Sequence, residues 1–265
     1  MKKWLSLGII ALGLVTLAAC GAKKVESGAD KDTVKVGLDD TFVPMGFKDD
    51  AGKIVGFDVD LANAVFKLTD TKVDFQPIDW SLKETELANG TIDMIWNGYT
   101  VNDERKEKVT FSDTYMKNIQ VLVTKKSSKI DSIEQMKGKI LGAQEGSSGY
   151  SVFNDQPKVL KDEVKDQDAT LYGSFSEGFL DLENGRIDGL LVDKVYAEYY
   201  LKKAGKLDEY NLIKTPYAQE EFAVGVRKDD QALADKINKG IKTLKENGEY
   251  EKIVTKWFGA DAVND

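Results

Sequence analysis

Strand-like and helix-like segments alternate along most of this chain, and that alternation is what most restricts its fold. Residues 33–38 (TVKVGL) and 72–76 (KVDFQ) alternate apolar and polar side chains as a half-buried strand does. Residues 57–69 place apolar side chains at helical spacing, and we predict a further helix over 80–90 and a third strand over 91–96. Because parallel strands need crossover connections, this β-α-β-α-β succession predicts an α/β fold with mostly parallel sheets flanked by helices.

The same order of elements returns in the second half of the chain. A predicted helix over 174–185 precedes a predicted strand over 187–193. The junctions LANGTID (87–93) and LENGRID (182–188) share Leu, Asn, Gly, Ile and Asp. Shared helix-ending chemistry explains this similarity as well as a repeated structural unit does. In either case the sequence predicts two similar α/β units.

Serine and glutamate three residues apart open two of these helices. The pairs are Ser81 with Glu84 and Ser174 with Glu177, and each has the pattern of a capping box. In a capping box the serine side chain accepts a hydrogen bond from the backbone N–H of the glutamate, and the glutamate side chain accepts one from the backbone N–H of the serine. We therefore expect both helices to begin at these serines.

The connections between the two units suggest how the chain is divided. A long strand within residues 118–143 can leave the first unit and enter the second, and a strand in 221–230 can return. The pattern permits two crossings without proving them. With two crossings, lobe 1 comprises residues 33–122 and 222–265, and lobe 2 comprises residues 123–221.

The N-terminus has the form of an export signal. Two lysines precede an apolar stretch that is short for a membrane span, and LAAC then ends in Cys20, the only cysteine. LAAC resembles a bacterial lipobox, in which the cysteine is lipidated and the chain is cut just before it. We expect a signal peptide over 1–19 and a lipidated, flexible tether over 20–32, which is small, charged and without apolar periodicity. A plain secretory signal is the alternative.

Composition excludes several classes of function. The chain has no histidine and, after Cys20, no cysteine, which excludes Ser-His-Asp and Cys-His catalysis and zinc sites of the usual kind. We expect neither a metal nor a cofactor. The formal net charge of −8 disfavours nucleic acids and anionic lipid surfaces as partners.

Chemically useful side chains follow the predicted strands. In open α/β sheets, ligands bind beyond the carboxyl ends of the strands. The side chains found there are hydroxyls, aromatic rings, one arginine and two aspartates, in Asp39, Phe42, Trp80, residues 97–105, residues 145–150 and Asp193. Each has an ordinary structural explanation, because the aromatic residues can lie in the core and the others can cap helices.

Together, these residues point to a zwitterionic ligand. Arg105 with hydroxyls and backbone N–H groups suits a carboxylate, and Asp193 suits an ammonium group. The rings of Phe42 and Trp80 suit a flat or cationic side chain. The sequence therefore predicts a site for an amino acid or a similar zwitterion.

Five stretches carry a family resemblance over nearly all of residues 33–259. They are GFDVDLANAV, LANGTIDMIWNGYTVNDERKEKVTFSDTY, MKGKILGAQEGSS, GRIDGLLVDKVYAEYY and KWFG. With them, the chain resembles the extracellular solute-binding proteins of polar amino acid ABC transporters. The resemblance implies a two-lobed, periplasmic-binding-protein-like fold, whose lobes are joined by two hinge strands and close on one amino acid.

The resemblance also implies roles for individual residues. Arg105 corresponds to the arginine that grips the ligand carboxylate, and Asp193 to the acidic residue that takes its ammonium group. Contacts to the carboxylate are implied for Gly98 and Thr100, and contacts from the second lobe for Ser147 and Ser148. Phe42 and Trp80 correspond to aromatic walls around the ligand side chain, and Asp39 to a contact at its distal end. Asn97 and Gln144 lie at variable specificity positions. Ser148 stands where many members have threonine, which leaves the ligand side chain open.

The implied function is that of a lipid-anchored receptor on the extracellular face of the membrane. We expect a monomer that is not an enzyme, captures a free amino acid and delivers it to the permease of an ABC transporter. Asp39 and the two aromatic rings favour arginine, ahead of lysine, with glutamine next. Alternatives are an enzyme on the same scaffold, such as a cyclohexadienyl dehydratase or a lytic transglycosylase, and a binder of small peptides or glutathione.

Overall fold

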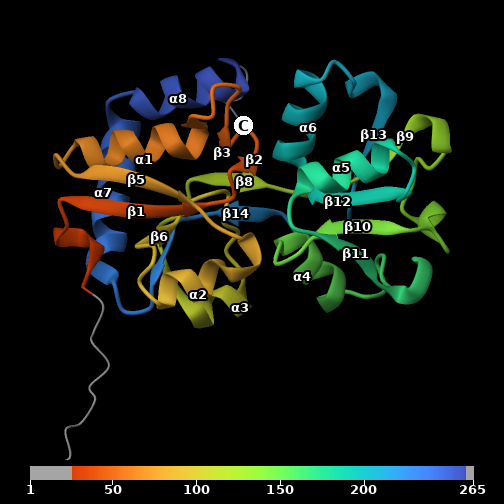
Figure 1. Ribbon diagram of the computed structural model, residues 1–265, viewed down its shortest axis with the longest axis horizontal. Helices are drawn as coiled ribbons and strands as arrows, with labels where there is room; N and C mark the ends of the chain where they lie inside the picture. Colours follow the sequence, from red (N-terminus) through yellow and green to blue (C-terminus); the bar gives the residue numbers. More distant parts are fainter. Residues whose placement is uncertain (1–25, 261–265) are drawn as a thin grey trace, which may run out of the picture.

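The computed structural model describes residues 26–260, which form two α/β lobes that lie side by side (Figure 1). The predicted signal peptide and Cys20 lie outside the described residues. Within residues 26–260, no helix is both long and apolar enough to cross a membrane.

The sheet of lobe 1 has five strands, and four of them run in the same direction. β1 pairs in parallel with β5 and β6, and β15 is antiparallel to both β6 and β7. The order across the sheet is β5 (Lys72–Pro77), β1 (Thr33–Leu38), β6 (Met94–Ile95), β15 (Gly225–Arg227) and β7 (Val109–Phe111). The sheet is therefore mostly parallel, as predicted.

The sheet of lobe 2 repeats this arrangement. β10 pairs in parallel with β11 and β12, and β9 is antiparallel to both β12 and β13. The order is β11 (Ala169–Tyr172), β10 (Leu141–Gln144), β12 (Gly189–Asp193), β9 (Gln120–Lys125) and β13 (Tyr210–Lys214). In each sheet the single reversed strand lies next to the third parallel strand, so the two lobes share one topology.

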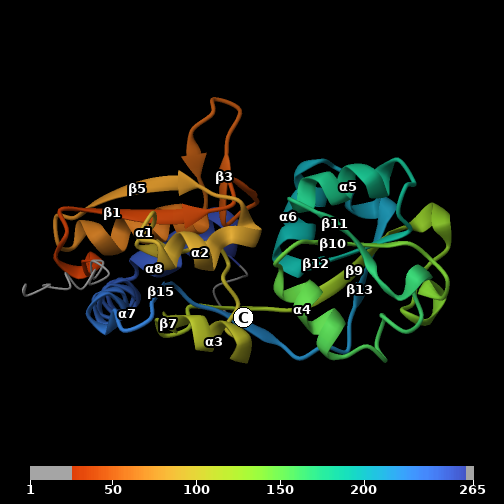
Figure 2. The same ribbon diagram turned by 60° about the horizontal axis from the view of Figure 1, so that its bottom comes forward.

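Helices cover both sheets. In lobe 1, α1 packs against α7 and α8, and α2 packs on β6; the bounds are α1 (Phe57–Lys67), α2 (Lys83–Ala88), α3 (Asp103–Lys108), α7 (Gln231–Glu246) and α8 (Glu249–Phe258). In lobe 2 the helices pack on the central strands; they are α4 (Ser148–Asp155), α5 (Phe175–Glu183) and α6 (Lys194–Lys203). A small sheet of β2 (Thr41–Phe42), β3 (Gly46–Lys48) and β4 (Ile54–Val55) projects from lobe 1 (Figure 2).

The two similar junctions in the sequence have the same structural role. Asp93 Oδ2 accepts a hydrogen bond from the backbone N–H of Lys35, and Asp188 Oδ2 accepts one from that of Ile140. In each lobe, this aspartate ties the start of the third parallel strand to the start of the first. The similarity between LANGTID and LENGRID therefore reflects a repeated structural unit as well as a shared way of ending a helix.

One of the two predicted capping boxes forms and the other does not. Ser174 and Glu177 make the full box at the start of α5. At the earlier helix, Asp79 instead accepts from the N–H of Ser81, and a short 3-10 turn (Trp80–Leu82) precedes α2. Glu84 is not free to cap, because its carboxylate accepts a hydrogen bond from the hydroxyl of Tyr99. A tertiary contact has replaced the local one.

The predicted tether is ordered in its last part. Ser27 Oγ donates to Asp230 Oδ1 at 2.6 Å, and the Gly28 N–H donates to Asp230 Oδ2 at 3.1 Å. Lys31 forms an ion pair with Asp93 at 2.7 Å. These contacts hold residues 27–31 on lobe 1, so the folded part of the chain begins before residue 33.

Two antiparallel strands cross between the lobes, β8 (Met116–Asn118) and β14 (Glu220–Phe222) (Figure 1). Lobe 2's own sheet begins at once after β8, with β9 at Gln120, so the predicted boundary after residue 122 falls inside β9. Short paired strands of this kind can bend without breaking the sheet of either lobe.

Candidate ligand-binding site

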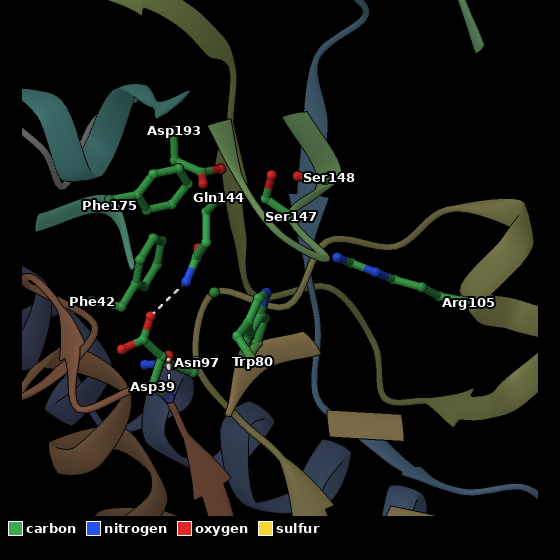
Figure 3. Close-up of a pocket in the computed structure, with 11 residues that line it drawn as sticks. Asp39, Phe42, Trp80, Asn97, Arg105, Gln144, Ser147, Ser148, Phe175 and Asp193 are labelled. Carbon is green, nitrogen blue, oxygen red and sulfur yellow. Dashed lines mark hydrogen bonds between the residues drawn. The ribbon is translucent and has the colours of Figure 1, made fainter. Parts of the chain in front are cut away.

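A narrow cavity lies between the lobes and has an empty volume of about 270 Å³. The structure brings together at this cavity every predicted site residue except Thr100, and adds Phe175 (Figure 3). The lining residues are Asp39, Phe42, Trp80, Asn97, Gly98 and Arg105 from lobe 1, and Gln144, Ser147, Ser148, Phe175 and Asp193 from lobe 2. Both lobes therefore contribute to one site.

Arg105 lies at one end of the cavity and is only 4% exposed. It stands in the first turn of α3, where the side chain of Asn102 caps the helix by accepting from the Arg105 N–H. Its guanidinium donates to the carbonyl of Thr100 at 2.9 Å and, across the cleft, to that of Gly146 at 3.1 Å. A guanidinium has five N–H donors, so donors remain for a ligand carboxylate.

A second buried cation, Lys83, lies beside this arginine. Its ammonium donates to the carbonyl of Trp80 at 3.1 Å and, like Arg105, to that of Gly146 at 3.0 Å. Burial lowers the pKa of Lys83 to about 8, and Arg105 adds to the lowering. Glu84 partly offsets the two positive charges, since its carboxylate lies 3.4 Å from the Lys83 ammonium. Sequence reasoning missed Lys83, because a lysine early in a short helix usually faces solvent.

Asp193 lies at the carboxyl end of β12 and is almost fully buried. It accepts hydrogen bonds from the side-chain amides of Asn118 and Gln120. The same two amides donate to Glu220 on the returning hinge strand β14. Neither the amides nor Glu220 was predicted as part of the site, because none of them follows a strand end. Their role depends on the crossing strands, which only the fold reveals.

Asp39 faces Gln144 across the cleft. Gln144 Nε2 donates to Asp39 Oδ2 at 2.8 Å, and Asn97 accepts from the Asp39 N–H at 3.0 Å (Figure 3). Burial raises the pKa of Asp39, and hydrogen bonds from Thr41 and Gln144 counteract this. A buried carboxylate at this place can pair with a positively charged or N–H-bearing side chain of a ligand.

Aromatic rings form the walls of the cavity. The ring of Phe42 lies 5.8 Å from that of Phe175 and 5.6 Å from that of Tyr196, so it joins the two lobes as well as lining the site. Trp80 packs edge-on against Tyr99 at 6.0 Å. Phe175 comes soon after β11, at the start of α5. The same strand-end rule that found Phe42 and Trp80 could therefore have found Phe175.

The small residues of the site have structural roles too. Ser147 caps α4, because its Oγ accepts from the N–H of Tyr150 at 3.1 Å. Ser148 Oγ accepts from the hydroxyl of Thr100 at 3.2 Å, across the cleft. Gly98 has a φ of +59° and its N–H donates to Asp58 at 2.7 Å, so this N–H is already engaged.

Asp58 holds that glycine turn from behind and is itself fully buried. It also accepts from the hydroxyl of Tyr115 at 3.0 Å, and burial raises its pKa to about 7. Within residues 26–260, no group of three histidine, cysteine, aspartate or glutamate side chains is placed to hold a metal ion. The residues that line the cavity offer ion pairing, hydrogen bonding and aromatic contact.

Comparisons with known proteins agree with this geometry. The family described as bacterial extracellular solute-binding proteins, family 3, matches residues 34–260. The arginine-binding extracellular protein ArtP of Bacillus subtilis is 33% identical over 97% of this chain and 98% of its own. A substrate-binding protein of Streptococcus pneumoniae, solved with bound histidine, is 52% identical with a TM-score of 0.87, covering 88% of this chain and 95% of its own.

A third similar structure is an ancestral arginine-binding protein bound to arginine. It is 37% identical with a TM-score of 0.79, and the match covers 86% of this chain and 99% of that one. The likeness thus extends over both lobes in sequence and in structure. The chain belongs to the bacterial extracellular solute-binding proteins of family 3.

Proposed function

We propose that this protein is the lipid-anchored receptor of an ABC importer and captures one free L-amino acid between its lobes. The observation that carries the proposal is the pair of opposite charges at the cavity. Arg105 comes from lobe 1 and Asp193 from lobe 2, and both are buried. A buried arginine and a buried carboxylate complement the carboxylate and the ammonium group that every free amino acid has.

Arg105 would bind the ligand carboxylate and Asp193 its ammonium group. One ligand then contacts both lobes, so binding would stabilise the closed arrangement and present a closed surface to the permease. The cavity is narrow and is lined by buried residues of both lobes, which supports a single amino acid rather than glutathione or another peptide.

A cationic side chain suits the rest of the cavity, with arginine ahead of lysine. The Asp39 carboxylate is buried, and Phe42 and Trp80 offer aromatic faces on which a guanidinium stacks better than an ammonium does. Histidine is a second candidate, because the structure from Streptococcus pneumoniae holds it and is 52% identical to this chain. Glutamine follows, since an amide can also donate to Asp39.

Titration of the ligand-stripped protein with each of the twenty amino acids tests this function. We expect saturable binding of L-arginine by calorimetry, with a dissociation constant in the micromolar range or below, about −8 kcal/mol. Tighter binding of glutamine or of an acidic amino acid would reject the choice of arginine and keep the receptor function. Failure of all twenty to bind would reject the receptor function itself.

Two further features belong to the proposal. The sequence LAAC, which ends in Cys20, supports a lipid anchor on the extracellular face of the membrane, where an importer's receptor must collect its ligand. The relative from Bacillus subtilis is named as a binding protein, which supports a receptor rather than an enzyme on this scaffold.

A further inference from the structure

Two buried carboxylates meet where the hinge strands join lobe 2. Asp193 is 5% exposed and Glu220 is 8% exposed. Asn118 Nδ2 donates to both of them, and so does Gln120 Nε2, at 2.9 Å to Asp193 and 3.0 Å to Glu220. Because one amide nitrogen reaches both acids, the two carboxylates are close neighbours.

The donors around this pair are neutral. The hydroxyl oxygens of Thr100 and Ser148 lie 3.2 and 3.3 Å from Glu220 Oε2, which completes a set of neighbouring amides and hydroxyls. Among residues 26–260, neither acid forms an ion pair with a lysine or an arginine. The buried cations of the cleft, Arg105 and Lys83, have Glu84 as their carboxylate partner.

The pair also has more acceptors than donors. Three buried oxygens have no hydrogen-bond partner within the described chain, namely Asn118 Oδ1, Gln120 Oε1 and Glu220 Oε1. A cluster with surplus acceptors and two neighbouring negative charges needs a cation or a proton. Neutral amides can supply hydrogen bonds but cannot supply the charge.

Burial and mutual repulsion both favour a proton on this pair. They raise the pKa of Asp193 to about 8, burial being the larger cause and Glu220 the next. Arg105 is the one charged group that acts in the opposite direction, together with hydrogen bonds from Gln120 and Asn118. Because Asp193 is coupled to its neighbour, a proton that is bound here belongs to the pair rather than to Asp193 alone.

We propose that Asp193 and Glu220 act as one diacid, which shares a single proton in the ligand-free protein and exchanges it for the ammonium group of the bound amino acid. This inference rests on the proposed function. The ammonium group keeps its own protons and donates to the ionised Asp193, and the displaced proton passes to the solvent. Glu220 is a positioning residue, because it reaches the cleft through Thr100 and Ser148.

The exchange of a proton for the ammonium group makes ligand affinity depend on pH in a defined direction. Below pH 8 the pair must lose a proton before the ammonium group can bind, so affinity rises with pH up to about 8 and then levels off. Asp39, which accepts a hydrogen bond from Gln144, is a second buried acid with a raised pKa, and it can also release a proton to the solvent when a cationic side chain binds. The experiment must separate proton release by the Asp193–Glu220 pair from proton release by Asp39. A substitution at Glu220 changes the first and leaves Asp39 unchanged.

Calorimetry with L-arginine in two buffers of different ionisation enthalpy counts the protons released on binding. If the amino-acid titration selects histidine, L-histidine is used in place of L-arginine. At pH 7 we expect about one proton per ligand from this pair in the natural protein. Glu220→Gln should release less than half as many, and its affinity should change less between pH 8 and 6. Glu221→Gln is the matched control, since this neighbour is exposed on the same strand, and it should behave as the natural protein does.

Two further measurements make the result decisive. Glu220→Asp retains a diacid and should retain proton release, provided that its melting curve shows a folded protein. 5-Guanidinopentanoate, which is arginine without the ammonium group, should bind weakly and without release from this pair. Equal proton release by the natural protein and Glu220→Gln would overturn the inference while arginine binding still stood. Absence of binding by every amino acid would instead overturn the proposed function.

Discussion

Arg105 shows how one residue can look like a surface cation in the sequence and lie buried in the fold. Its neighbours in α3 are charged and exposed, whereas its own guanidinium stacks on the ring of Tyr99 at 4.5 Å and reaches lobe 2. Because Arg105 lies in the first turn of α3, its side chain points towards the cleft. Its contacts with Tyr99 and Thr100 of lobe 1 and with Gly146 of lobe 2 account for its burial.

Arg105→Ala should weaken amino-acid binding by roughly 30-fold or more, because removing one partner of a buried charged pair typically costs about 2–5 kcal/mol. Arg105→Lys should recover only part of the loss, since an ammonium lacks the two-pronged geometry of a guanidinium. Calorimetry measures both. Lys106→Ala is the control, as this lysine is next in the helix and 55% exposed. Normal affinity in Arg105→Ala would contradict its assignment to the ligand carboxylate.

At the scale of elements, the loop from β10 to α4 connects the two lobes when they are closed. The Gly146 carbonyl accepts from both Lys83 and Arg105 of lobe 1, and the glycine has a φ of +71°. A Cβ at this position would lie 3.1 Å from Lys83 Nζ and 3.2 Å from Ser81 Cα. These neighbours all belong to the other lobe, so the crowding exists only in the closed arrangement.

Gly146→Ala should therefore weaken ligand binding several-fold beyond its effect on folding. The matched control is Gly185→Ala, which has the same φ of +71° in the same lobe and no atom within 4 Å of the added Cβ. Both substitutions should lower stability by about 1–2 kcal/mol through backbone strain, as thermal unfolding would show. Equal affinities for the two variants would refute the closure role of this loop.

At the scale of the whole molecule, two lobes of one topology are joined by β8 and β14, and the candidate site exists only where they face each other. A lipid on Cys20 would leave a short segment before residue 27, where the chain packs against lobe 1. The lobes would then stay close to the membrane and to a permease within it.

Cys20→Ser should release the protein from the membrane fraction of the expressing bacterium while leaving amino-acid affinity unchanged. The reason is that two acyl chains anchor a protein stably, at about 0.8 kcal/mol for each buried CH₂, and serine cannot form the thioether. Fractionation with immunodetection measures the first effect, and calorimetry on the soluble protein the second. A variant that was still cleaved just before residue 20 and stayed in the membrane fraction would rule out the lipid anchor.

The sequence by itself determined the α/β lobes, their repeated order and most of the residues around the cavity. Those features depend on local patterns: apolar periodicity defines the strands and helices, and the strand-end rule locates Asp39, Phe42, Trp80 and Asp193. The capping box at Ser174 was predicted correctly for the same reason, since both partners lie within one helical turn.

Only the tertiary structure decided which groups surround these residues. Glu84 was predicted to accept from the backbone N–H of Ser81 and instead accepts from the hydroxyl of Tyr99. The N–H of Ser81 donates to Asp79. Asp193 and Glu220 are far apart in the sequence and became one buried pair through β8 and β14. Electrostatic coupling depends on distance and burial, and neither can be read from residue spacing.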